Sequence, residues 1–238
     1  PTVARFVDRY WLVTWDLTGQ EPYTQQVFAH PVVNVVFADD TATVHGVTTS
    51  MGSRVLEGAG RALGIMFRPA GFRPFLGRSM STITDRALPM VDVFGPEAAT
   101  LERHVLAAVA APDMVAAADG FLAARVPGEA QSCERISAIV ERASADASLV
   151  RVDDMAAQAG ISVRQLQRQF GDEVGVSPKA VIRRYRLYEA AERARLGTDN
   201  DWAALATELG YSDQSHLTRD FTAAIGMAPD RYARACRA

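Results

Sequence analysis

The sequence predicts an α+β protein in which a β-rich barrel or sandwich with helices precedes an all-α domain of two helix-turn-helix units joined by a long helix. Three observations predict this fold class in the 238-residue chain. Short apolar runs separated by turn residues fill the first third, alanine-rich helical periodicity follows, and the last third contains one segment twice. We expect a first domain over residues 1–127 and a second over residues 128–238.

Six β-prone runs are expected in the first third, and Gly, Pro and Asp residues separate them, as is typical of turns between strands. These runs cover residues 11–17, 25–29, 32–38, 42–47, 53–56 and 62–67. Several short strands at this spacing predict a sandwich or barrel. The run 32–37 is apolar at both alternating positions, which predicts a central strand covered on both faces.

Helical periodicity begins after the turn at residues 68–72. Leu, Val and Ile recur three and four residues apart in the alanine-rich segments 96–110, 113–126 and 132–145, which predicts three helices. Pro96 suits a first helical turn. We expect a linker at residues 127–131 and helical sequence from there to the end.

The repeated segment occurs at residues 155–178 and again at residues 205–229, about 50 residues apart. Each copy places an Arg two residues before a Phe and ends in a Gly and a Pro. A helix, a glycine-containing turn and a second helix with exposed polar residues is the layout that lets a helix enter a DNA major groove. Two copies predict contacts with two neighbouring grooves.

In the first copy, the second helix is expected over residues 163–172, with Ser162 as its N-cap. Leu166 and Phe170 are four residues apart and therefore share the buried face. The residues on the opposite, outward side are Arg164, Gln167, Arg168 and Gly171.

The second copy follows the same rule, because Leu217 and Phe221 share the buried face. The residues left outward or near the helix start are Gln214, Ser215, His216, Thr218, Arg219 and Thr222. Arg can donate two hydrogen bonds to guanine, and Gln can pair with adenine, each contact giving roughly 1 to 3 kcal/mol of discrimination. A solvated helix face is the alternative for each residue taken alone.

Between the copies, Ser177 and Pro178 predict an N-cap and a first turn for a helix that ends near Leu196. This helix is about 28 Å long, which suits recognition helices in grooves roughly 34 Å apart. Its basic residues are Arg183, Arg184, Arg186, Arg193 and Arg195. We expect phosphate contacts at Lys179, Arg183 and Arg184. For Arg183, Arg184 and Arg186, a solvated stripe or ion pairing with Glu189 and Glu192 is the alternative.

Charge and cysteine content limit the function classes. The net charge of −3 divides into −4 for residues 1–149 and +1 for residues 150–238, so positive charge for nucleic acid must be local. Cys133 and Cys236 are lone thiols without zinc-site spacing. No apolar run approaches the roughly 18 residues of a membrane span, and no signal pattern opens the chain. We therefore expect a cytoplasmic protein without membrane contact, although a segment can precede Pro1.

The repeated residues resemble the AraC/XylS family of bacterial transcription regulators over about residues 150–235. The residues that carry the resemblance are Gly160-x-Ser162, Leu166-x-Arg168-x-Phe170, Gly175-x-Ser177-Pro178, Arg186-Leu187-x-x-Ala190, Gly210-Tyr211-x-Asp213-Gln214-Ser215, Leu217-x-Arg219-x-Phe221 and Gly226-x-x-Pro229-x-x-Tyr232. The resemblance implies base contacts from Arg164, Gln167, Arg168, Gln214, Ser215, His216 and Arg219. Thr218 joins them because it also faces outward.

The chain departs from the family pattern where lysine commonly follows the key phenylalanine, since Gly171 and Thr222 stand there. Val181 also replaces an aromatic residue, and Ala228 replaces a common serine. These differences bear on phosphate contacts. They leave open a helical module that binds other proteins and not DNA.

The amino-terminal region resembles the β-rich, cupin-like sensor domains attached to many such regulators. The residues that carry this resemblance are Tyr10-Trp11, Trp15, His30-Pro31, Asn34, Gly46 and the turn Arg68-Pro69-x-Gly71-Phe72. Trp15, Phe37, Phe67 and Phe72 are the candidate lining of a small-molecule effector pocket, with core packing as the alternative. His30 and His45 are isolated and lack a metal-ligand pattern, so we expect no metal and no cofactor.

Together these features predict a sequence-specific transcription regulator that binds double-stranded DNA as a homodimer, contacts the transcription machinery and responds to a possible effector. No catalytic residue is expected. The alternatives are a cupin-type metal enzyme and a DNA-repair methyl acceptor fused to the helix-turn-helix module. The first needs clustered metal ligands and the second a reactive cysteine in a basic, exposed setting.

Overall fold

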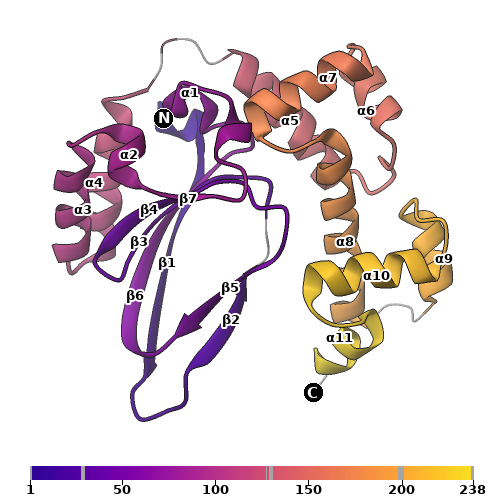
Figure 1. The fold of residues 1–238 in the computed structure, drawn as a ribbon, viewed down its shortest axis with the longest axis horizontal. Helices are drawn as coiled ribbons and strands as arrows, with labels where there is room; N and C mark the ends of the chain where they lie inside the picture. The colour runs from indigo at the N-terminus through magenta and orange to yellow at the C-terminus, as the bar shows by residue number, and fades with distance from the viewer. Residues whose placement is uncertain (1, 28–29, 127, 129–130, 198–200, 237–238) are drawn as a thin grey trace. The chain divides into compact units, whose positions relative to one another are not determined.

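The computed structural model of the protein describes residues 2–27, 30–126, 128, 131–197 and 201–236 (Figure 1). An antiparallel β-sheet region precedes a helical region, so the predicted α+β class is confirmed. The chain forms two compact units. The first contains Pro1–Ala138 and Gln169–Val176, and the second contains Ile139–Arg168 and Ser177–Ala238. The expected functional boundary at residues 127 and 128 stays a prediction, and part of the expected linker lies outside the described residues.

Five antiparallel strands form the main sheet of the first unit, in the order β1-β6-β3-β4-β7. Their bounds are β1 Val7–Leu17, β6 Gly58–Phe67, β3 Asn34–Ala38, β4 Thr41–His45 and β7 Ala87–Pro89, after a 3-10 turn at Val3–Arg5. Strand β3 lies between β6 and β4, which confirms the central strand expected at residues 32–37. Val35 and Phe37 are buried in it.

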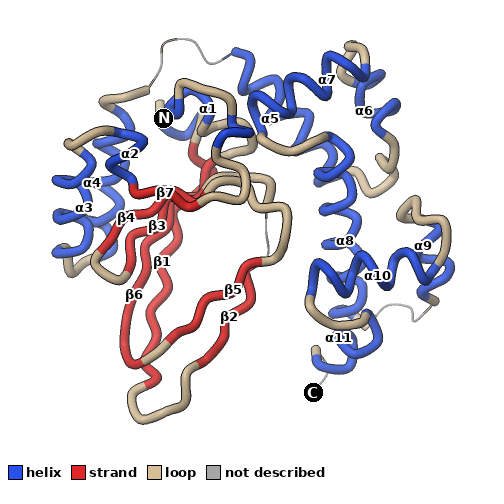
Figure 2. The backbone as a smooth tube through the Cα atoms, viewed as in Figure 1, coloured by secondary structure: helices blue, strands red, loops and turns tan. Residues whose placement is uncertain are grey.

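Strands β2 (Tyr23–Val27) and β5 (Gly52–Leu56) form a separate two-stranded ribbon (Figure 2). The pair β1–β6 ends where Leu17 meets Gly58, and the pair β2–β5 starts where Tyr23 meets Leu56, so one long ribbon changes direction at this point. All six expected strands are present, although residues 28 and 29 lie outside the described part of the chain.

The two faces of the sheet have different partners. Helices α3 (Ala98–Ala107) and α4 (Ala111–Ala123) cover one face, where Tyr10 Oη donates to Asp119 Oδ1 at 2.9 Å. On the other face Trp11 lies on Gly64 and Trp15 lies on Gly60, where any larger side chain would collide with the indole rings. The indole Nε1 of Trp11 donates to Asn34 Oδ1 at 3.3 Å.

A cluster of phenylalanine rings fills the space beside the sheet. The Phe67 and Phe72 ring centroids lie 4.8 Å apart, and Phe72 leads through Phe94 to Phe121. Short helices α1 (Arg73–Leu76) and α2 (Met90–Phe94), a 3-10 turn at Met80–Thr82 and strand β7 complete this region. These short elements lack the periodicity that revealed the longer ones.

The helical region begins with α5 (Gln131–Ala145) and carries the repeated segment. Its other helices are α6 Val152–Gln158, α7 Val163–Gln169, α8 Pro178–Leu196, α9 Trp202–Glu208, α10 Gln214–Ile225 and α11 Pro229–Ala235. Trp202, Leu217 and Phe221 belong to a buried cluster that includes α8 residues such as Leu187. None of the described helices is both long and apolar enough to span a membrane.

The segment that closes the first copy differs from the expected regular helix. After α7 the chain winds into a π-helical turn at Phe170–Val174, because Gly175 N donates to Phe170 O at 2.8 Å, five residues back. This turn packs within the first compact unit. There Arg73 Nε pairs with Asp172 Oδ2 at 3.2 Å, and Thr84 Oγ1 donates to Gly175 O at 2.7 Å.

Candidate nucleic-acid interface

The repeated sequence is also a structural repeat. The turn glycines Gly160 and Gly210 have φ values of 67° and 78°, in the left-handed region that favours glycine. The following amides return to the preceding helix in the same way, Ile161 N to Ala156 O at 3.1 Å and Tyr211 N to Ala206 O at 2.8 Å. Each copy is therefore a helix, a tight turn and a second helix.

The first recognition helix, α7, begins as the sequence predicts. Gln165 N donates to Ser162 Oγ at 3.2 Å, which confirms Ser162 as the N-cap. Leu166 is fully buried, whereas Arg164, Gln167 and Arg168 are exposed. The polar face of this helix is therefore open to a ligand.

The second recognition helix, α10, is capped by Asp213, whose Oδ1 accepts from His216 N at 2.8 Å. Leu217 and Phe221 are fully buried. Of the expected contact residues, Gln214, Ser215 and Arg219 are exposed, and His216 and Thr218 are half-buried.

Sequence reasoning missed an acidic residue on this helix. Asp220 Oδ2 lies 2.5 Å from Arg183 Nε, and the Asp220 side chain is only 14% exposed. Arg183 is one of the three expected phosphate contacts, so its guanidinium already faces a carboxylate. The position of Asp220, three residues after buried Leu217, was the available signal that it borders the core.

Helix α8 joins the two helix-turn-helix copies. Ala180 N donates to Ser177 Oγ at 3.2 Å with Pro178 in the first turn, as expected, and Gly197 ends the helix with φ 70°. Helices α6 and α7 lie at one end of α8, and α9 to α11 lie at the other (Figure 1). Lys179 is exposed and Arg184 is half-buried.

The basic stripe expected along α8 is partly wrong. Arg186 is 2% exposed and donates to Ala143 O at 2.5 Å, and burial lowers the pKa of this guanidinium. Glu189 and Glu192, which the alternative paired with Arg183, Arg184 and Arg186, pair instead with Arg193 at 2.8 Å and Arg195 at 2.6 Å. The exposed cations on α7, at the start of α8 and on α10 are Arg164, Arg168, Lys179 and Arg219.

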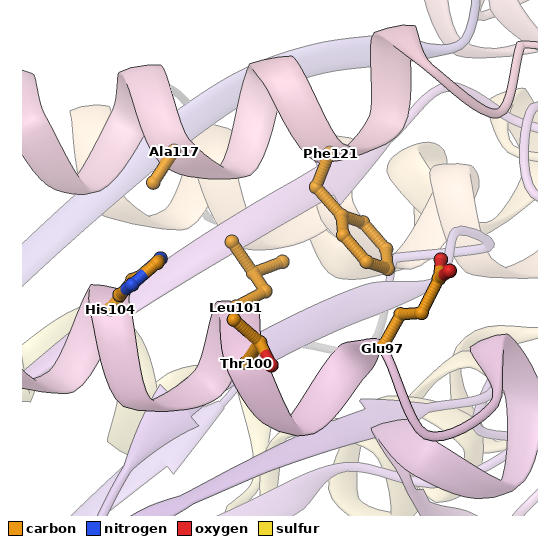
Figure 3. A pocket seen from close by; sticks show the side chains of 6 residues that line it. All are labelled: Glu97, Thr100, Leu101, His104, Ala117 and Phe121. Atoms are coloured by element: carbon orange, nitrogen blue, oxygen red, sulfur yellow. The ribbon is translucent and has the colours of Figure 1, made fainter.

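Of the four residues expected to line an effector pocket, Phe67 and Phe72 meet in the core, whereas Trp15 lies apart from them. Phe37, Phe67 and Phe72 are buried in the core. Trp15 pairs with Gly60 of β6, and Phe37 pairs with Leu63 of the same strand. Residues 60 and 63 point to opposite faces of the sheet, so Trp15 lies on the other face from Phe37. A hollow of about 340 Å³ does lie between α3 and α4, but other residues line it: Glu97, Thr100, Leu101, His104, Ala117 and Phe121 (Figure 3).

The described part of the chain bears on both enzyme alternatives. No group of three or more His, Cys, Asp or Glu residues there can hold a metal ion. Cys133 is buried, and burial raises the pKa of its thiol, which disfavours the reactive thiolate. Cys236 is exposed on the last described turn.

Two helix-turn-helix units held on one long helix define the class of double helix-turn-helix DNA-binding domains. A family model described as a helix-turn-helix domain matches residues 155–235, and a model described as a domain of unknown function (DUF6597) matches residues 1–89. Residues 155–235 therefore form a helix-turn-helix domain of the AraC type.

Curated relatives carry regulatory names. The transcriptional activator NphR of a Rhodococcus species is 30% identical over 191 residues, which cover 78% of this chain and 52% of NphR. The HTH-type transcriptional regulator Rv1931c of Mycobacterium tuberculosis is 34% identical over 85 residues, 36% of this chain and 32% of that protein. The chain thus spans about half or less of the length of these relatives.

Solved structures give similar matches. An AraC-type transcriptional regulator from Chromobacterium violaceum is 26% identical, with 46% of this chain and 97% of that chain covered and a TM-score of 0.40. ToxT from Vibrio cholerae O395 is 11% identical, with 97% and 98% covered and a TM-score of 0.45.

Proposed function

We propose that the protein is a sequence-specific DNA-binding transcription regulator whose two recognition helices, α7 and α10, enter successive major grooves. The observation that carries this proposal is the structural repeat, in which both copies bury the same apolar positions and expose an arginine at the same offset. Those arginines are Arg168 and Arg219. The family match over residues 155–235 supports the same function.

Each recognition helix has a distinct set of proposed base contacts. Arg164, Gln167 and Arg168 act from α7, and Gln214, Ser215, His216, Thr218 and Arg219 act from α10. Arginine and glutamine supply the two-donor and donor-acceptor patterns that distinguish guanine and adenine in the major groove. Lys179 and Arg184, near the start of α8, supply phosphate contacts.

The decisive experiment selects bound duplexes from a random oligonucleotide pool and then measures affinity against salt concentration. Phosphate contacts release counterions, so affinity for a random duplex must fall steeply as salt rises. We expect Arg168→Ala and Arg219→Ala each to weaken the selected duplex about 5- to 150-fold, the equivalent of roughly 1 to 3 kcal/mol, with a smaller effect on a random duplex. Equal losses on both duplexes would reassign these arginines to the backbone. A wild-type protein with no salt-dependent affinity would favour the protein-interaction module.

The first domain is proposed to sense a small molecule or to mediate assembly, with a cupin-like arrangement of its strands. The long ribbon that turns from β1–β6 into β2–β5 supports this arrangement, since Arg54 of β5 lies 5.7 Å from the ring centroid of Trp15 in β1. An effector must favour one state of the protein, because equal affinity for two states shifts nothing. Native mass spectrometry without any bound small molecule would favour a ligand-independent regulator.

We also propose a homodimer that acts in the bacterial cytoplasm together with the transcription machinery. Two copies on adjacent sites gain affinity through effective concentration. Sedimentation that shows only monomer at micromolar concentration, both free and on DNA, would overturn the dimer.

A catalytic role is not part of the proposal, because the named relatives are regulators. Metal analysis and thiol titration test the two enzyme alternatives directly.

A further inference from the structure

One carboxylate joins the second recognition helix to the connector helix. Asp220 of α10 pairs with Arg183 of α8 through an Oδ2 to Nε distance of 2.5 Å. The two side chains differ in environment, because Asp220 is 14% and Arg183 is 51% exposed. An ion pair with one partner so little exposed is screened less by solvent than a surface pair, so it holds these two helix faces together.

The contact extends to the start of the recognition helix. His216 Nε2 lies 3.8 Å from the same Oδ2 of Asp220, and His216 Nδ1 lies 3.2 Å from Ser212 Oγ. The ring of His216 also meets Tyr211 edge-on, with centroids 5.1 Å apart. A chain of polar contacts therefore runs from α8 along α10 to the helix-turn-helix turn.

A second arginine of α8 holds the other helix of this unit. Arg193 Nη2 lies 2.6 Å from Glu208 Oε1 of α9, and Arg193 Nη1 donates to Glu208 Oε2 at 2.8 Å. Arg183 and Arg193 are ten positions apart, about 15 Å along the helix axis. Two ion pairs at this separation hold both helices of the second helix-turn-helix copy, α9 and α10, against α8.

The charge of Arg183 is offset by Asp220. A phosphate contact contributes to affinity through the net positive charge that displaces counterions. An Arg–Asp pair has no net charge, so Arg183 adds little to that effect while the pair is intact.

We propose that Arg183 is a positioning residue, whose ion pair with Asp220 sets the angle of α10 on α8 and therefore the spacing between the two half-sites. This inference rests on the proposed function, and it replaces the phosphate contact expected at Arg183. Half-site spacing is a geometric property of the protein, so loss of the pair affects binding to a correctly spaced duplex more than binding to an arbitrary one.

The test uses the full chain and two duplexes, one selected by the wild-type protein and one of random sequence. Arg183→Gln and Asp220→Asn are each expected to weaken the selected duplex by about tenfold, and the random duplex by less than about twofold. The double variant is expected to bind the selected duplex no more weakly than the weaker-binding of the two single variants, because the effects of two residues in contact do not add. Arg183→Lys and Asp220→Glu keep the charges and are expected to retain most of the affinity.

Lys179→Gln is the matched control, because Lys179 is an exposed cation on the same helix. This variant is expected to weaken both duplexes equally and to reduce the slope of log affinity against log salt by about 0.9. Arg183→Gln is expected to leave that slope unchanged. When the selection from the random oligonucleotide pool is repeated with Asp220→Asn, the selected duplexes are expected to keep the first half-site. The distance from it to the second half-site is expected to vary more than with the wild-type protein.

Asp220→Asn distinguishes a positioning role of Arg183 from a phosphate contact, because the two roles predict opposite changes in affinity. If Arg183 contacts phosphate, removal of the neighbouring carboxylate tightens both duplexes, and that outcome overturns the positioning role alone. Equal loss on both duplexes for Arg183→Gln does the same. A wild-type protein that enriches no sequence overturns the proposed function itself. Thermal unfolding identifies any variant that fails to fold, and the charge-conserving variants then decide the question.

Discussion

Gly64→Ala is expected to destabilise the first unit because its new methyl group has no space. A Cβ at residue 64 would lie 1.9 Å from Trp11 Cε2 and 2.1 Å from Trp11 Cζ2, far inside van der Waals contact. The indole must move by about 1.5 Å to restore a normal contact of roughly 3.5 Å. That shift strains the hydrogen bond from Trp11 Nε1 to Asn34 Oδ1, now 3.3 Å long.

Overpacking of this kind costs about 1 to 3 kcal/mol, and loss of the indole hydrogen bond accounts for about 0.5 to 1.5 kcal/mol of a total in that range. In a unit of this size, the Tm for unfolding of the first unit should fall by roughly 3 to 10 °C. Differential scanning calorimetry measures the shift, and tryptophan fluorescence reports the moved indole.

Gly120→Ala is the matched control. Gly120 lies within α4 and has open space around its Cβ position, so alanine should stabilise the unit by about 0.5 to 1 kcal/mol. The same substitution thus has opposite signs at the two sites. Trp11→Leu in the Gly64→Ala background should recover part of the loss. An unchanged Tm for Gly64→Ala would refute the steric reasoning.

Three further predictions follow from other contacts. Ser177→Ala removes the cap of α8 that Ala180 N uses at 3.2 Å, and should cost about 1 kcal/mol in thermal unfolding; a change below about 0.3 kcal/mol would show that the cap is dispensable. Glu173 is buried, with Oε1 bound by Ser132 Oγ at 2.6 Å and burial raising the pKa of the carboxyl above its usual 4.5. A raised pKa in the folded state means that this carboxyl favours folding most below pH 4.5 and less as pH rises through its folded pKa, so Glu173→Gln should stabilise the protein at pH 7 and lose that advantage below pH 4.5. Urea titration at both pH values measures the difference, and an equal effect at both would contradict it. A thiol reagent should modify exposed Cys236 rapidly and buried Cys133 slowly, whereas two equally fast thiols would show that Cys133 is accessible.

Local sequence patterns predicted those parts of the fold that depend on local periodicity. The six strands and the recognition helices follow from apolar spacing, and Ser162 and Ser177 follow from capping chemistry. Both recognition helices bury the residues that the four-residue spacing selected, because a helix presents positions i and i+4 to the same side.

The rest depends on partners far away in the sequence. Arg183 meets Asp220, 37 positions later, and Arg186 meets Ala143, 43 positions earlier. Neither separation belongs to a helical or strand repeat. Sequence alone therefore does not distinguish the buried Arg186 from the paired Arg183. The aromatic residues chosen for an effector pocket show the same limit. Phe67 and Phe72 meet, but Trp15 lies on the other face of the sheet, and alternation along one strand does not show which face a helix will cover.

The eight residues Gln169–Val176 close a recognition helix, yet they pack with the sheet-containing unit. Gly175 O accepts from Thr84 Oγ1, and its amide returns to Phe170 O. Amide hydrogen exchange in this segment should therefore report the opening of the sheet-containing unit, whereas the amides of α10 report only the helical one. The order of the segment that follows α7 therefore depends on its contacts with the sheet-containing unit.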